Sequence, residues 1–201
     1  MVQLPRVSEA RLDFLKELAN IGVGNAATSL SQMINDEKIS MNVPEVVVIP
    51  LQDITAFIEE EKPIAAIFFE AQSDDFRLMI ILTLSEESAQ ILARKVLQSH
   101  SGKMGEMERS ALIEIGNIVN SAYLNALSAL TGITILPSPP SLALDMGGAI
   151  LGTILAETSM AEDYLILSVT SISTEKEDIM GNVIVFPYQG SMERIFNSMG
   201  V

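Results

Sequence analysis

The sequence predicts an α/β fold of two similar halves around a pseudo-twofold axis, with two long helices and shorter helices packed on a mostly antiparallel sheet. Three observations predict it. The chain repeats itself at an offset of 97 residues, two long segments have apolar residues at three- and four-residue steps, and each is followed by Val/Ile/Phe-rich segments broken by prolines. With 201 residues, the chain is expected to be one domain built from two repeats, approximately residues 8–98 and 105–201.

The two long helices are expected over residues 12–35 and 109–132, whose sequences align at this offset. Glu17 aligns with Glu114, and Asn20 aligns with Asn117. The apolar steps place one face of each helix against a core. Gly132 is the expected C-cap of the second helix, because the residue after a helix end often needs a positive φ.

Each long helix is followed by the same succession of expected elements: an extended stretch containing proline, two strands and a short helix. β-branched and aromatic residues favour the strands, and prolines mark their turns. The first half has these elements at 39–44, 64–69, 78–84 and 86–97, and the second at 133–137, 165–169, 182–186 and 192–199.

The composition excludes several classes of protein. Lys and Arg number 12 against 26 Asp and Glu, so the net charge of −14 disfavours binding to nucleic acid or to an anionic membrane surface. Cysteine is absent and His100 is the only histidine, which excludes disulfides, thiolate nucleophiles and His-rich metal sites. The longest apolar run, residues 147–156, is too short to span a membrane, and the N-terminus lacks the apolar core of a signal peptide. A cytoplasmic protein is therefore expected.

Both long helices carry the same polar pattern on the side opposite their apolar residues. Neither Glu17 nor Glu114 has a Lys or Arg four residues later, so the usual helical ion pair is missing. Small residues follow the first amide, at positions 22 and 24–27, and would let another backbone or a flat partner surface approach closely. The aligned polar positions are Asp13, Glu17, Asn20 and Gly24 in the first helix and Ser110, Glu114, Asn117 and Ser121 in the second.

The residue types limit the chemistry of this pattern. An amide donates and accepts hydrogen bonds without titrating, so it can orient a water molecule but cannot deprotonate it. A nearby Glu could be a general base, a metal ligand or an anchor for a partner lysine. Phosphoryl hydrolysis would require a divalent cation, for which the sequence offers no evident ligand cluster, so the metal would arrive with the substrate. A single Glu-x-x-Asn would be read as solvated surface; two copies in equivalent places weigh against that reading.

These residues resemble a known family. D-x-x-x-E-x-x-N-I-G-x-G-N-A at 13–26 and S-x-x-x-E-I-G-N-I at 110–118 are similar to the paired signature of the CheC branch of the CheC/CheX/FliY phosphatases, which act on phosphorylated CheY, the chemotaxis response regulator. The resemblance covers essentially the whole chain and includes L-D-M-x-x-A-I at 144–150.

The resemblance implies roles for individual residues. Asn20 and Asn117 would position the hydrolytic water on the regulator's aspartyl phosphate, and Glu17 and Glu114 would pair with its active-site lysine. Asp13 and Ser110, one turn before each Glu, would belong to the partner-binding surface.

The resemblance also implies cofactors and partners. Magnesium would be bound by the regulator, so the chain would need no cofactor of its own. Asp145 would contact CheD, a receptor-modifying deamidase. The alternative is a non-catalytic adaptor that binds phosphorylated CheY or regulates CheD without hydrolysing anything.

Overall fold

The computed structural model describes residues 8–34, 40–98, 104–157, 162–173 and 178–201; His100 and Ile39 lie outside the described residues. The helices are α1 (Glu9–Met33), the 3₁₀-helix η1 (Leu51–Ala56), α2 (Glu86–Leu97), α3 (Glu106–Thr131), α4 (Gly147–Glu157) and α5 (Ser191–Met199). The strands are β1 (Ser40–Pro50), β2 (Pro63–Gln72), β3 (Arg77–Ser85), β4 (Leu136–Pro137), β5 (Ser141–Met146), β6 (Tyr164–Ser173) and β7 (Asp178–Pro187).

The strands form one sheet in the order β1-β6-β7-β3-β2-β4, with β5 also paired to β2. All of these pairings are antiparallel. The sheet interleaves the two halves of the sequence, because β6 and β7 lie between β1 and β3, with β1 paired to β6 and β3 paired to β7. The predicted α/β fold with a mostly antiparallel sheet is therefore confirmed.

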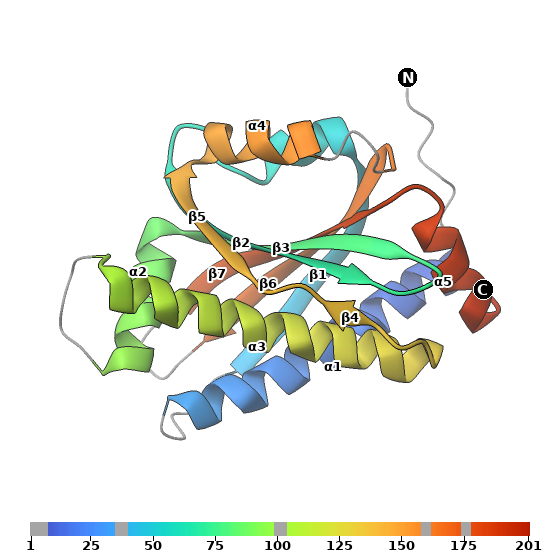
Figure 1. Cartoon of the computed structure of the whole chain (residues 1–201), viewed down its shortest axis with the longest axis horizontal. Helices are drawn as coiled ribbons and strands as arrows, with labels where there is room; N and C mark the ends of the chain where they lie inside the picture. The colour runs from blue at the N-terminus through green and yellow to red at the C-terminus, as the bar shows by residue number, and fades with distance from the viewer. Residues whose placement is uncertain (1–7, 35–39, 99–103, 158–161, 174–177) are drawn as a thin grey trace.

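Helices cover both faces of the sheet. Leu78, Ile80 and Leu82 of β3 pack in the core beneath α1 and α3, whereas Met79 and Ile81 pack beneath η1 and α4. Successive side chains of a strand point to opposite faces, which explains this division. Figure 1 shows α4 on the opposite side of the sheet from α1 and α3.

The helix ends follow from local chemistry. Ser8 Oγ accepts a hydrogen bond from the Arg11 backbone N–H at 3.2 Å and Ser85 Oγ accepts one from the Ser88 backbone N–H at 3.1 Å, so each satisfies a free donor in the first helical turn. Gly132 has φ 70° and ends α3, as predicted.

Three elements were not predicted: η1, β5 and α4. The apolar run at 147–156, assessed from the sequence only as a membrane candidate, lies in α4 and buries Ile150, Leu151 and Ile154 against the sheet. No described helix is long and apolar enough to cross a membrane. The extended stretch expected at 133–137 is a strand only at Leu136–Pro137.

The proline pair explains the break between β4 and β5. Pro139 and Pro140 lie between these two strands, and proline has no N–H to donate to a neighbouring strand. The interrupted chain then pairs with β2 from Ser141 onward.

Candidate functional site

The two Glu–Asn pairs lie on the exposed sides of α1 and α3. These helices run in opposite directions and pack against each other on one face of the sheet (Figure 1). Glu17, Asn20, Glu114 and Asn117 are all exposed. A spacing of three residues places each Glu beside its Asn on the helix surface. Both amides can therefore reach a molecule that docks on the helices.

The two carboxylates are not neutralised by neighbours. Among the described residues, neither Glu17 nor Glu114 forms an ion pair or a side-chain hydrogen bond. Asp13 is exposed one turn before Glu17 and faces Lys16 at 3.9 Å, and Ser110 is exposed one turn before Glu114. Each Glu is thus open to a cationic group of a partner.

The small residues that follow Asn20 divide between the two uses expected of them, because some meet another helix and others are exposed to a partner. Gly22 and Ala26 are buried between α1 and α3. A Cβ at Gly22 would lie 2.9 Å from Cδ2 of Tyr123, closer than real Cβ contacts. This glycine serves the close approach of the two helices, and only Gly24 and Asn25 remain exposed for a visiting surface.

Asp145 lines a hollow near the start of α3. It is exposed near the end of β5, where its Oδ1 accepts a hydrogen bond from the Met146 backbone N–H at 2.7 Å. With Arg109 and Met146 it lines a hollow to which neither Asn20 nor Asn117 contributes. No residue of either Glu–Asn pair lines the hollow at Asp145.

The Gly-Gly pair after Asp145 starts α4 in close contact with the chain at 59–60. A Cβ at Gly147 would lie against the carbonyl oxygen of Glu59, so only glycine fits there. The Gly147 N–H donates to the Lys62 carbonyl at 2.8 Å, and the Gly148 N–H donates to the Glu60 carbonyl at 3.0 Å. These contacts fix the backbone that carries Asp145.

A polar groove between the two long helices was missed by the sequence analysis. Uncharged amides and hydroxyls from both helices line it, and Asn117 is one of them. The signal was present in the Asn25–Ser29 and Ser121–Asn125 pairs, four residues apart and therefore on one side of each helix. The groove, called here the α1–α3 groove, is lined by Asn25, Thr28, Ser29, Asn117, Ile118, Ser121, Ala122 and Asn125.

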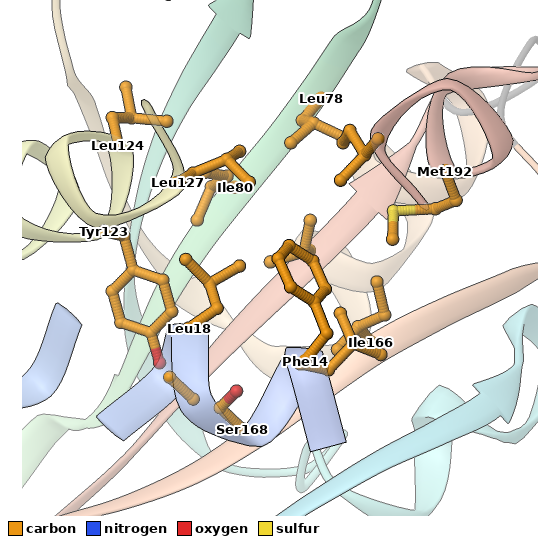
Figure 2. Close-up of a pocket in the computed structure, with 14 residues that line it drawn as sticks. Phe14, Leu18, Leu78, Ile80, Tyr123, Leu124, Leu127, Ile166, Ser168 and Met192 are labelled. Carbon is orange, nitrogen blue, oxygen red and sulfur yellow. The ribbon is translucent and has the colours of Figure 1, made fainter. Parts of the chain in front are cut away.

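The cavity beneath the helices is not a ligand site. Figure 2 shows it lined by apolar side chains such as Phe14, Leu78 and Met192, between α1, α3, α5 and the sheet. Its volume of about 30 Å³ has room for about one water molecule, far below the several hundred cubic ångströms of small-molecule pockets. No residue of either Glu–Asn pair lines it.

The Tyr123 hydroxyl is buried at this cavity. It has no hydrogen-bond partner at normal distance among the described residues, although Ser168 lies at the same end of the cavity (Figure 2). Burial raises the pKa of Tyr123 to about 12, and the Ser168 hydroxyl opposes this shift more weakly. Tyr123 is thus a neutral core residue and not a candidate catalytic acid.

No group of three or more acidic or histidine side chains in the described ranges is arranged to hold a metal ion. Each exposed Glu–Asn pair offers one carboxylate and one amide. Such a pair can attract a cation and orient a water molecule.

Known proteins are similar to this chain in sequence and in fold. The model of the CheC-like family matches residues 11–48 and 107–143, which are α1 with most of β1 and α3 with the β4–β5 segment. The CheY-P phosphatase CheC of Bacillus subtilis (strain 168) is 30% identical over 201 aligned residues, covering 96% of each chain.

Two solved structures are similar as well. Thermotoga maritima FliY superposes with a TM-score of 0.78 at 18% identity, covering 98% of each chain. The CheX–CheY–BeF3–Mg complex of Borrelia burgdorferi contains a chain with a TM-score of 0.55 at 17% identity, covering 89% of this chain and all of that one. The sequence match to the B. subtilis protein spans both helices that carry the Glu–Asn pairs. This chain belongs to the CheC-like family.

Proposed function

We propose that this chain is a phosphatase that hydrolyses the aspartyl phosphate of phosphorylated CheY. The observation that carries the proposal is the pair of exposed Glu-x-x-Asn sites on α1 and α3 in a member of the CheC-like family. The B. subtilis relative is named a CheY-P phosphatase, and the solved CheX complex contains CheY.

In the proposed mechanism, Asn20 or Asn117 enters the regulator's active site and orients a water molecule for attack on phosphorus. An amide can donate to one oxygen while accepting from the water, and it keeps this capacity at any physiological pH. Attack breaks the bond between phosphorus and the aspartyl oxygen, which leaves inorganic phosphate and a free aspartate. The proton of the attacking water passes to a phosphoryl oxygen, so the products balance as aspartate and H2PO4− and no separate base is needed.

The Glu of each pair is proposed to anchor the regulator. Glu17 and Glu114 have no ion-pair partner among the described residues, so each can pair with a lysine of the regulator. Magnesium is proposed to be bound by the regulator, where it neutralises the phosphoryl oxygens. An acceleration of about 100-fold over the regulator's own hydrolysis requires about 2.7 kcal/mol, which one oriented amide and the docking contacts can supply.

The test is phosphate release from magnesium-loaded phospho-CheY by four proteins: wild type, Asn20→Ala, Asn117→Ala and the double variant. Each single variant is expected to lose part of the activity, and the double variant nearly all of it. Affinity for beryllofluoride-activated CheY, measured in parallel, separates a loss of catalysis from a loss of binding. A double variant that hydrolyses at the wild-type rate would disprove the catalytic role, and the non-catalytic adaptor would then be the better description.

CheD is proposed as a second partner, which docks at the surface around Asp145. The test uses Asp145→Asn, which keeps the Oδ1 acceptor for the Met146 N–H and removes only the charge. Weaker CheD binding with unchanged phosphate release is expected. Unchanged CheD affinity would show that the charge of Asp145 does not contribute to CheD binding.

A further inference from the structure

The α1–α3 groove makes the two Glu–Asn sites unequal, because Asn117 lines it and Asn20 does not. The groove extends from Asn117 across to α1, whose Asn25, Thr28 and Ser29 form the opposite wall. A molecule that docks at Asn117 therefore meets polar side chains of two helices.

The groove side chains have free hydrogen-bonding capacity. Within the described part of the chain, the Thr28 hydroxyl donates to the Gly24 carbonyl at 3.1 Å, whereas Asn25, Ser29 and Asn125 make no side-chain hydrogen bond. All four residues are exposed. None of the groove residues is charged. Their contribution to docking would consist of hydrogen bonds and would respond little to salt.

The repeat shows that some polar side chains of this groove have no polar counterpart beside Asn20. At the 97-residue offset, Asn25 and Ser29 of α1 correspond to Ala122 and Ala126 of α3, and Ser121 of α3 corresponds to Gly24 of α1. Ala126 is also buried. A partner at Asn20 would therefore find alanine methyl groups in place of Asn25 and Ser29 and bare backbone in place of Ser121, whereas Thr28 and Asn125 correspond to each other and are polar at both sites.

We infer that CheY docked at Asn117 also binds α1 through Asn25 and Ser29, which makes the Asn117 site the tighter of the two. This inference rests on the proposed function. Asn25 and Ser29 are positioning residues: they contact the protein substrate beside the reacting atoms and leave the chemistry to Asn117.

The test isolates one site at a time. In the Asn20→Ala background, where turnover depends on Asn117, Asn25→Ala and Ser29→Ala are each expected to raise KM for phospho-CheY about 2- to 10-fold with kcat unchanged, as expected for the loss of one docking hydrogen bond. The matched control is Gln52→Ala, which truncates an exposed amide in η1 on the opposite face of the sheet.

A second readout does not depend on turnover. Binding of beryllofluoride-activated, magnesium-loaded CheY should weaken by a similar factor in the Asn25→Ala and Ser29→Ala variants. A double-mutant cycle should show coupling, so that either change has a larger effect when Asn117 is present than when it is Ala.

Two results would overturn the inference: an unchanged KM in the Asn20→Ala background, or equal effects of Asn25→Ala whether position 117 is Asn or Ala. Failure of the proposed function gives a different result, namely phosphate release that persists in the Asn20→Ala/Asn117→Ala double variant.

Discussion

Asn20 and Asn117 each present one uncharged amide at an exposed position of a rigid helix. An aspartate would have nearly the same shape, but it accepts hydrogen bonds only and carries a negative charge. The proposed role needs a donor near the phosphoryl oxygens, which are themselves negative. The amide, and not merely a polar side chain of that size, is therefore the functional group.

Asn117→Asp tests whether the amide itself is required or whether any polar side chain of that size is sufficient. In the Asn20→Ala background, we expect phosphate release to fall to the level of the double alanine variant, because Asp loses the donor and repels the phosphate. The measurement is single-turnover hydrolysis of phospho-CheY. Activity above that of Asn117 would indicate a general base at this position and contradict the water-orienting role.

Tyr123 provides a prediction about stability. Tyr123→Phe removes a buried hydroxyl without a partner, so we expect the free energy of unfolding at neutral pH to stay equal or to rise by about 1 kcal/mol. Urea unfolding measures it. A loss of 1 kcal/mol or more, coupled to Ser168→Ala, would show that the two hydroxyls form a hydrogen bond that the structure does not contain.

The same residue makes stability depend on alkaline pH. The pKa of Tyr123 rises from 10.0 to about 12 on folding, so its protonated form favours the folded state. The associated stability is present in full below pH 10 and is lost as the pH rises through 12, at about 1.4 kcal/mol per pH unit between these values. Between pH 10 and 11, the free energy of unfolding of Tyr123→Phe should therefore fall less steeply with pH than that of the wild type. Equal slopes for the two proteins would contradict the raised pKa of Tyr123.

At the scale of elements, the position of α3 on the sheet depends on a glycine. A Cβ at Gly116 would lie 2.5 Å from Cγ2 of Ile67, which is fully buried in β2. This close approach sets the position of α3 on the sheet at Gly116, the residue before Asn117. The contact between Gly116 and Ile67 therefore determines both how the helix packs and where the amide of Asn117 lies.

Gly116→Ala should destabilise the protein by about 1–3 kcal/mol, because the buried Ile67 has no space to move away. Gly152→Ala in α4 is the matched control, since no heavy atom lies within 4 Å of its Cβ position. At that exposed helical site alanine should stabilise by up to about 1 kcal/mol. Denaturant midpoints measure both changes, and equal midpoints for the two variants would disprove the packing argument.

Local patterns predicted α2, α5 and the long helices because their apolar residues repeat at helical spacing. They failed for α4, where Ile150, Leu151 and Ile154 face the sheet amid other apolar residues. A helix with little polar contrast between its faces has no clear periodic signal. Its identity is decided by the second face of the sheet, which the sequence does not show.

At the scale of the whole molecule, the two halves of the chain are interleaved. β1 has β6 as its neighbour in the sheet, and β3 pairs with β7. The first and last helices are joined as well, because the guanidinium of Arg11 in α1 donates to both carboxylate oxygens of Glu193 in α5, at 2.6 and 2.9 Å. The division into two repeats stays a prediction about ancestry, whereas the sheet is shared between the halves.

Interleaving predicts that neither half folds alone. Fragments 1–103 and 104–201 would each leave strand edges and apolar sheet faces unpaired, so we expect no cooperative thermal transition by circular dichroism from either one. The intact chain should unfold in a single transition with equal calorimetric and van't Hoff enthalpies. A cooperative transition in one fragment would contradict this expectation.

The sequence by itself determined the two long helices, α2, α5 and the main strands, the spacing that places Glu and Asn on one helix side, and the family resemblance, because each of these is written in residues that are near one another along the chain. The tertiary structure decided which small residues are buried, since that depends on where α1 meets α3. It also decided that Asn117 and not Asn20 lies beside the α1–α3 groove. A groove requires two surfaces, and its second wall lies almost a hundred residues away in the sequence.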